Sequence, residues 1–345
     1  MNKRIFIVAF FAFLFLAGSV YAAIGITELR TEQLKNPLGI DVRQPRLGWR
    51  IESDEQNVMQ TAYHILVASS ADLLAQEKGD IWDSGKIESD ASQWIAYQGK
   101  PLKRNARYYW KVKVYTNRGE ADWSAPAFWS MGLLNEADWQ GQWIGLDRAA
   151  SGDSETQWSR LAARYLRKEF ALSKEVKRAT VHIAGMGLYE LFINGQRIGD
   201  QVLAPAPTDY RKTILYNTYD VTPQLRKENA IGVTLGNGRF YTMRQNYKPY
   251  KIPTFGYPKL RLNLIVEYMD GSKETIATNT SWKLTTEGAI RSNNEYDGEE
   301  YDARKELGNW TQSGYDDKSW IAAQRVSIPS GTLRAQIMPG MKVMD

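Results

Sequence analysis

Tyr108-Tyr-Trp-Lys-Val-Lys-Val-Tyr115 is the stretch that decides the fold. Its side chains alternate, so that Trp110 and Val112 face one way while Lys111 and Lys113 face the other. A period of two is typical of a β-strand with one buried and one solvated face. This stretch therefore predicts a strand of an antiparallel sheet that has one face in the core and the other in solvent.

The same pattern recurs along most of the chain, most clearly at 63–68 and 259–268. Turn signals separate such strands at Asn117-Arg-Gly119, Asn194-Gly195 and Asp270-Gly271. One short helix is predicted from Ala71 to Lys78, with Ser70 as its N-cap. Many short strands at this spacing predict an all-β protein built from antiparallel sandwiches.

The first residues have the composition of an export signal. Lys3 and Arg4 precede an apolar run that is too short to span a bilayer well, and small residues close it at Ala22. We expect residues 1–22 to be a signal peptide, so that the mature chain is periplasmic or extracellular. No later segment is apolar enough to cross a membrane, so no membrane partner is expected after cleavage.

Composition narrows the classes of partner. Without Lys3 and Arg4 the formal charge falls from +5 to +3, which is too weak a bias to predict nucleic-acid binding. The 345 residues include no Cys, so packed cores must stabilise the chain without disulfides. His64 and His182 are the only histidines, which excludes a histidine-based metal site or triad. The 12 Trp and 19 Tyr provide flat faces that suit the C–H surfaces of sugars.

The first block of strands ends in a recognisable hairpin. The strand at 108–115, a turn, Trp123-Ser124 and a strand reaching Ser130 resemble the last hairpin of a fibronectin type III sandwich. With Trp82-Asp-Ser-Gly85 and Pro45-Arg-Leu-Gly-Trp49, the block resembles the N-terminal module of bacterial α-L-rhamnosidases, glycoside hydrolase family 78. The resemblance implies a scaffold role for this module.

The second block carries an ordered set of motifs. They are Gly187-Leu-Tyr-Glu-Leu-Phe-Ile-Asn-Gly-Gln-Arg-Ile-Gly-Asp200, Thr208-Asp-Tyr-Arg211, Leu235-Gly-Asn-Gly238 and Glu295-Tyr-Asp-Gly-Glu-Glu-Tyr-Asp-Ala-Arg304. This set resembles the jelly-roll β-sandwich that follows the fibronectin-like module in the same family. The expected organisation is a signal peptide (1–22), a fibronectin type III-like domain (23–138), a connector (139–162), a jelly-roll domain (163–328) and a linker strand (329–345).

The resemblance implies an activity for the family. Its members cleave terminal α-linked L-rhamnose from glycans or glycosides by inversion, with a carboxylate pair in a later helical barrel. This chain has no repeated amphipathic helices, so we predict no catalytic residue in it and expect the barrel in a missing C-terminal domain. Glu299 and Asp302 are an alternative pair of carboxylates, but nothing in the sequence places them in a pocket. The predicted role is substrate recognition and scaffolding, and the alternatives are a free-standing exported lectin and a purely structural fragment.

A carbohydrate site is predicted in the loops of the jelly-roll domain. Its candidate residues combine aromatic faces with hydrogen-bonding groups, as a small polar ring with C–H patches requires. They are Tyr189, Glu190, Asn237, Arg239, Tyr241, Tyr296, Glu299 and Tyr301. The competing interpretation is that Tyr189 and Tyr301 are packing residues and the carboxylates serve loop geometry.

No cofactor is predicted to be required, but calcium is a candidate. Some relatives bind rhamnose in this domain with calcium, helped by an Asp-Asn pair where this chain has Gly185-Met-Gly-Leu188. Glu190, Asn237 and Asp297 are the remaining candidate ligands, since calcium takes several oxygens at once. The alternative, which the missing pair favours, is that Glu190 pairs with an arginine and that the acidic run Asp297, Glu299, Glu300 and Asp302 is a solvated loop.

The C-terminal residues alternate like a connecting strand. From Leu333 onward the apolar Ile337, Met338, Met341 and Val343 have no partner evident in the sequence. We expect this tail to be poorly supported by the rest of the chain and to present an exposed apolar edge.

Overall fold

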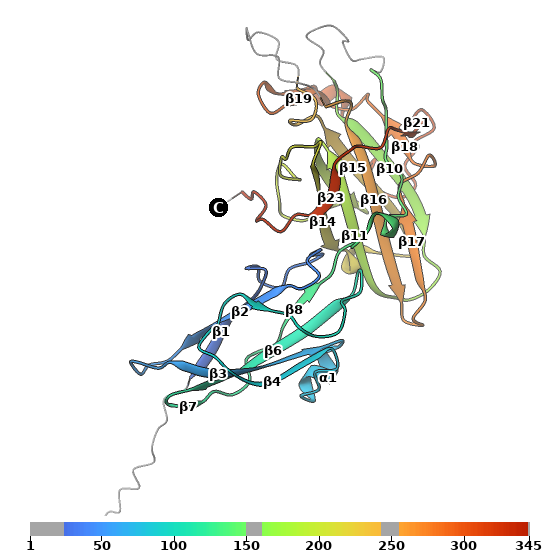
Figure 1. Cartoon of the computed structure of the whole chain (residues 1–345). Coiled ribbons are helices and arrows are strands. Elements are labelled where there is room, and N and C mark those ends of the chain that lie inside the picture. Colours follow the sequence, from blue (N-terminus) through green and yellow to red (C-terminus); the bar gives the residue numbers. More distant parts are fainter. Residues whose placement is uncertain (1–23, 150–160, 243–254, 344–345) are drawn as a thin grey trace, which may run out of the picture.

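The computed structural model describes residues 24–149, 161–242 and 255–343, and they form two β-sandwiches with very little helix (Figure 1). The expected all-β class and the succession of a fibronectin- or immunoglobulin-like sandwich and a second sandwich are confirmed. The predicted signal peptide lies outside the described residues. Within the described ranges, no helix has the length and apolarity needed to cross a bilayer.

The first sandwich packs a sheet of three strands on a sheet of five. The smaller sheet contains β1 (Gly25–Thr31), β2 (Arg46–Glu52) and β5 (Ile95–Ala96). The larger contains β3 (Gln60–Ala68), β4 (Trp82–Glu88), β6 (Arg107–Thr116), β7 (Gly119–Glu120) and β8 (Ala127–Ser130). Between them lie the fully buried Trp49, Trp110 and Trp129. The alternation of β6 thus directs Trp110 into the core, as the sequence predicts.

The outer face of β6 is less exposed to solvent than its lysines suggest. Helix α1 (Ala71–Ala75) packs on this face, and its N-cap is Ser70, whose hydroxyl accepts from Leu73 N at 3.2 Å. Lys111 is therefore buried, with its ammonium 4.8 Å from the centre of the Trp123 ring. The predicted helix and its cap are confirmed, but the helix ends three residues early, and the expectation of a solvated Lys111 is wrong.

The second sandwich packs a sheet of six strands on one of seven. The first contains β13 (Gln196–Ile198), β12 (Leu188–Ile193), β15 (Glu228–Gly236), β10 (Arg164–Ala171), β18 (Lys283–Thr285) and β21 (Ile321–Ala322), in this order. The second contains β22 (Gln324–Arg325), β9 (Ile144–Gly145), β16 (Lys259–Tyr268), β11 (Val176–Met186), β14 (Thr213–Asp220) and β23 (Thr332–Ala335), with β17 (Lys273–Ala277) paired to β16.

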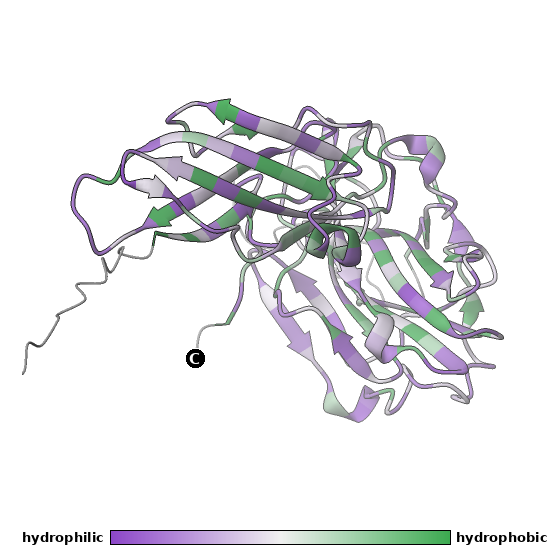
Figure 2. Cartoon of the chain, turned by 90° about the horizontal axis from the view of Figure 1, so that it is seen from below, coloured by the Kyte–Doolittle hydropathy of each residue, from purple (hydrophilic) through white to green (hydrophobic). Residues whose placement is uncertain are grey.

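The facing sides of these two sheets supply one apolar core. Leu166 and Val233 from the first sheet belong to the same buried cluster as Val181 and Leu264 from the second. The banding of hydrophobic and hydrophilic residues along the strands is visible in Figure 2. A separate hairpin, β19 (Ile290–Asn294) and β20 (Gly298–Tyr301), lies at the end of the sandwich distant from the first domain (Figure 1). Short 3-10 turns occupy Glu136–Asp138, Thr222–Gln224 and Ala303–Lys305.

The C-terminal segment is better supported than the sequence suggests. β23 pairs in parallel with β14, from Thr213 opposite Thr332 to Tyr216 opposite Ala335. Further on, Val202 N donates to Met341 O at 2.9 Å. The expectation of a poorly supported tail is therefore wrong for 332–335, because the edge of β14 supplies the pairing. The expected exposure of Met338 and Val343 is confirmed.

Two tryptophans of the expected connector pack against the second sandwich. Trp139 and Trp143 belong to one buried cluster with Met186 and Tyr216, and Leu133 from the end of the first domain joins it. The ring centres of Trp139 and Tyr216 are 5.3 Å apart in an edge-on arrangement. The start of the connector is thus part of the packing that joins the domains.

A buried polar contact also crosses the junction. His182 of β11 is fully buried, and its Nε2–H donates to Asn105 Oδ1 at 3.1 Å while Nδ1 accepts from the Thr218 hydroxyl at 2.9 Å. Arg178 donates to the Asn105 carbonyl oxygen. Burial, reinforced by the charge of Arg178, lowers the pKa of His182 to about 3, so the ring stays neutral in the folded protein.

Acid should therefore destabilise the fold through His182. In the unfolded chain this ring binds a proton below its ordinary pKa of about 6.5, whereas in the folded chain it does so only near the lowered value. The contribution of His182 to the free energy of unfolding is thus fully present above the unfolded pKa and is lost as the pH falls below it. From pH 8 to pH 5 we expect a loss of about 2 kcal/mol in the free energy of unfolding, measured by urea denaturation. The His182→Asn variant should lack this loss and His64→Asn should keep it; equal slopes in both variants would contradict the assignment.

Candidate functional site

The predicted carbohydrate residues separate into buried and exposed groups. Tyr189 is 5% exposed, its hydroxyl donates to Asn217 Oδ1 at 2.8 Å, and burial raises its pKa. Tyr241 is 8% exposed and stacks on Tyr257 with ring centres 5.7 Å apart. Both rings lie within the protein, and the packing interpretation is confirmed for Tyr189 but wrong for Tyr301. Tyr301 is exposed instead, and its hydroxyl donates to Glu306 at 2.7 Å.

The charged members of the predicted site occupy the loop end of the second sandwich. Glu190 accepts from Arg197 Nε at 3.2 Å. Arg239 donates to Glu295 at 2.7 Å and to the Tyr296 hydroxyl at 3.3 Å. Burial and, to a lesser extent, the charge of Glu190 raise the pKa of Glu299. Glu299 lies on the exposed strand β20, so this part of the predicted site is a charged surface.

Asn237 has an unusual environment. It is 2% exposed, its Nδ2 donates to Leu161 O at 2.8 Å, and its backbone N–H donates to Asn293 Oδ1 at 2.6 Å. Its Oδ1 is buried with no hydrogen-bond partner among the described residues. Such an orphaned oxygen is the kind of acceptor that a polar ligand or a cation satisfies.

Two of the three candidate calcium ligands already accept hydrogen bonds from other side chains. Glu190 is held by Arg197, as the alternative interpretation expects, and Asp297 accepts from Asn294 Nδ2 at 2.9 Å. Over the described ranges, no three Asp, Glu, His or Cys side chains gather closely enough to hold a metal. Calcium takes six to eight oxygens, and no step below depends on a metal.

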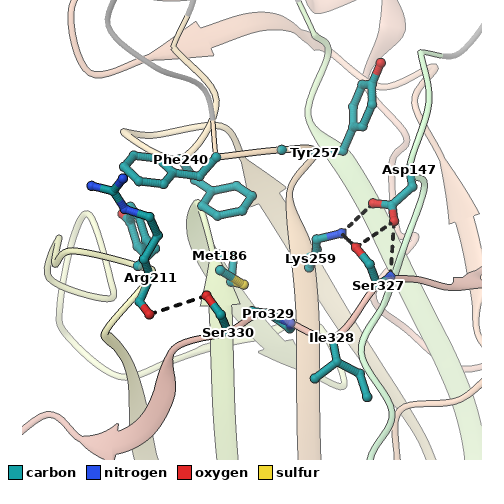
Figure 3. Close-up of a pocket in the computed structure, with 13 residues that line it drawn as sticks. Asp147, Met186, Arg211, Phe240, Tyr257, Lys259, Ser327, Ile328, Pro329 and Ser330 are labelled. Atoms are coloured by element: carbon teal, nitrogen blue, oxygen red, sulfur yellow. Dashed lines mark hydrogen bonds and ion pairs between the residues drawn. The ribbon is translucent and has the colours of Figure 1, made fainter.

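A cavity of about 420 Å³ lies beside the predicted residues (Figure 3). Aromatic rings form one side of it: Tyr210 meets Phe240 and Phe255 edge-on, each with ring centres 5.2 Å apart, and Met186 lies at the floor. The segment from Ile328 to Ser330, just before β23, closes another side. The pairing of β23 with β14 therefore helps to shape this cavity.

The opposite side of the cavity is polar. Lys259, at the start of β16, is 5% exposed, and its ammonium donates to Asp147 Oδ1 at 2.6 Å and to Ser327 Oγ at 2.9 Å (Figure 3). Ser327 N also donates to Asp147 Oδ2 at 3.2 Å. The Lys259 side chain is buried, whereas the Asp147 side chain is 36% exposed. Their shared hydrogen bonds preorganise this carboxylate and ammonium for ligand hydroxyls.

The composition of the cavity suits binding better than hydrolysis. Aromatic faces opposite a few fixed polar groups match the needs of a sugar ring. Asp147 is the only carboxylate among the described residues that line the cavity, whereas acid–base hydrolysis of a glycoside uses two. Sequence reasoning missed this cavity because Asp147, Lys259 and Ser327 come from three distant segments. The nearest signal was the Phe240-Tyr241 pair after the glycine turn.

Comparison with known proteins agrees with this architecture. Residues 26–135 match the family model described as Rha78A-like, N-terminal immunoglobulin domain. Residues 174–345 match the model described as α-L-rhamnosidase N-terminal domain. Together the two matches take in the first sandwich and most of the second, whose strands β9 and β10 lie between the matched ranges.

The similar curated proteins are α-L-rhamnosidases. One from Formosa agariphila is 40% identical over 330 residues, which cover 90% of this chain and 34% of that protein. One from Alteromonas sp. (strain LOR) is 34% identical over 308 residues, which cover 88% of this chain and 33% of that protein. The chain thus spans about a third of the length of the curated relatives it matches.

The solved structures that resemble this chain include α-L-rhamnosidases as well. The α-L-rhamnosidase from Dictyoglumus thermophilum superposes with a TM-score of 0.85 at 38% identity, covering 94% of this chain and 37% of that one. The Streptomyces avermitilis α-L-rhamnosidase, solved in complex with L-rhamnose, gives a TM-score of 0.84 at 25% identity, covering 94% of this chain and 47% of that one.

Proposed function

Because this chain belongs to the α-L-rhamnosidase family through the N-terminal domains of its members, we propose that it is the substrate-recognising part of an exported α-L-rhamnosidase. The observation that carries this proposal is the 38% identity with a solved rhamnosidase across 94% of the chain. The ligand would be terminal α-linked L-rhamnose of a glycan or glycoside. The hydrolytic step is assigned to parts of the relatives that lie beyond the matched third of their length.

We propose the cavity between Phe240 and Lys259 as the seat of the sugar. A rhamnose ring has a methyl group and C–H faces that aromatic side chains can cover. Its hydroxyls can bridge the Asp147 carboxylate and the Ser327 hydroxyl, which already share hydrogen bonds with Lys259. Tyr241 connects this cavity to the residues predicted from sequence, because it stacks on Tyr257 of the cavity wall.

Titration with L-rhamnose tests this function. We expect NMR shifts at the cavity with a Kd in the millimolar range, about −4 kcal/mol. Phe255→Ala should weaken binding about five-fold because one aromatic face is lost. Phe128→Ala, at an equally half-buried phenylalanine of the first domain, should leave it unchanged. The titration is run with and without calcium. Shifts at Glu190, Arg239 and Glu299 would favour the loop site predicted from sequence, and no shifts at tens of millimolar sugar would leave only a scaffold.

The same preparation should not release p-nitrophenol from an aryl α-L-rhamnoside. A glycosidase needs an acid with a raised pKa and a second carboxylate across the scissile bond. Hydrogen bonding by Arg304 lowers the pKa of Asp302 to about 2, so Asp302 cannot be the acid. Glu299 has a raised pKa but stands on an exposed strand, β20. Turnover that is lost in Glu299→Gln would overturn the recognition-only role.

Export is a separate part of the proposal. The charged start at Lys3 and Arg4 and the apolar run after them support cleavage after Ala22 and a periplasmic or extracellular location. N-terminal sequencing of the protein recovered from its native host should begin at Ala23. An uncleaved Met1 in the cytoplasmic fraction would contradict this.

A further inference from the structure

A second, larger cavity lies between the two sandwiches and is unrelated to the sugar cavity above. It is an open groove of about 1040 Å³. The first domain contributes the start of helix α1 and residues 100–109, and the second contributes parts of β11, β16 and β17 and the turn after β14. Its position at the domain junction gives one extended ligand access to both domains.

Cationic side chains outnumber carboxylates around this groove. The cations are Lys100, Lys103, Arg107, Lys177, Arg178 and Lys273, and the carboxylates are Asp72, Asp220 and Glu267. Two of the carboxylates are already neutralised. Arg107 of the first domain pairs with Asp220 of the second at 2.8 Å, and Glu267 pairs with Arg178 at 2.7 Å and with Lys273 at 3.0 Å.

These pairs hold their acids in the charged form. Burial acts to raise the pKa of Asp220 and of Glu267, but hydrogen bonds from Thr222 and Arg107 lower the first, and hydrogen bonds from Arg178 and Lys273 lower the second. Asp220 and Glu267 are therefore ionised, but each is already paired with a cation. Their negative charges do not compensate Lys100, Lys103 and Lys177. The surplus charge in the groove is therefore positive.

Two lysines carry most of this surplus, one from each domain. Lys103 and Lys177 are both exposed, and no hydrogen bond or ion pair joins either ammonium to another residue in the described part of the chain. Lys100 donates to the backbone oxygen of Asp80 at 2.6 Å, which leaves its charge uncompensated. Pro101, Tyr109 and Pro223 add apolar faces between these charges.

We propose that this groove binds an anionic polysaccharide, whose carboxylate or sulfate groups contact Lys103 and Lys177 while its sugar rings lie on the apolar faces between them. The choice of a polysaccharide rests on the proposed function, since glycans are the substrate class of this family. A polymer fits better than a small anion because the lysines stand on two domains along one open groove. Bound there, the polymer would hold the chain on a charged matrix, while the cavity proposed for the uncharged rhamnose stays free.

Paired polymers test this proposal on the full chain. Dextran sulfate and dextran share a backbone, and polygalacturonate and its methyl ester share another, so each pair isolates one anionic group. We expect binding to dextran sulfate, polygalacturonate or both, weakened as salt rises, and none to the uncharged partners. Affinity electrophoresis and calorimetry measure it, and the two pairs distinguish sulfate from carboxylate as the recognised group.

Charge reversal locates the site. Lys103→Glu with Lys177→Glu should lower the affinity for the charged polymer on the order of ten-fold. Lys35→Glu with Lys318→Glu, also one exposed lysine from each domain, makes the same charge change elsewhere and should lower it far less. Lys103→Gln with Lys177→Gln repeats the test with a smaller perturbation, and thermal melts verify folding.

Three results would overturn the proposal: no binding to either charged polymer, equal losses in the groove and control variants, or equally tight binding of a single-stranded oligonucleotide. Failure here is distinguishable from failure of the proposed function. Binding of L-rhamnose should be unaffected by the groove variants, and its absence would leave the polymer result standing as a property of the groove alone.

Discussion

Deleting residues 329–345 should lower the free energy of unfolding by about 3 kcal/mol, because β23 is an integral strand of the second sandwich. The deletion exposes the edge of β14 and removes Ala335, which is 7% exposed, together with Leu333 from the shared cluster. It also removes Gln336, whose N–H donates to Tyr216 O at 2.9 Å and whose side-chain oxygen accepts from Ala206 N at 3.0 Å. Circular dichroism during heating should show a melting temperature lower by roughly 10 °C.

A shorter deletion is the control. Removing residues 338–345 keeps β23 and takes away the bridge from Val202 to Met341 and the ion pair of Lys342 with Asp200. It should change melting little, because exposed ion pairs contribute little, and it should reduce self-association by removing exposed Met338, Met341 and Val343. If both deletions melted like the full chain, the pairing of β23 with β14 would contribute nothing to stability.

Replacing Trp139 by alanine should cost about 3–5 kcal/mol in the free energy of unfolding, the range for removing a large buried aromatic side chain. The indole is 6% exposed, its ring meets Tyr216 edge-on, and the Arg261 guanidinium lies 5.3 Å from its ring centre. The substitution leaves a cavity where the connector, the first domain and the second sandwich meet. Urea denaturation monitored by circular dichroism measures the loss.

Two other substitutions bracket this effect. Trp139→Phe keeps an aromatic ring against Tyr216 and should cost clearly less than alanine. Trp94→Ala removes a tryptophan that is 55% exposed and whose main contact is the Arg46 guanidinium at 4.4 Å. Its cost should be about 1 kcal/mol or less. A Trp139→Ala variant no less stable than Trp94→Ala would mean that the cluster at the domain junction does not support the fold.

Much of the candidate site could not be predicted from sequence, and the reason differs between residues. Tyr189 and Tyr241 look like ligand-facing aromatics because they stand in loop and hairpin motifs, yet both are buried. Glu190 is held by Arg197 across the β12–β13 hairpin, a local pairing that the sequence does suggest. Asp147, Lys259 and Ser327 leave no pattern, since only the packed sheet brings them together.

The sequence by itself determined the strands, the two-sandwich class, the Ser70 cap and the family. Each of these can be recognised from residues close together in the chain: the period of two, the turn residues and the short motifs. Only the tertiary structure decided the burial of Lys111 beneath Trp123, the parallel pairing of β23 with β14, and the neutral His182 at the domain junction. Each of these depends on which distant segment covers a residue, because burial and ion pairing are set by neighbours in space.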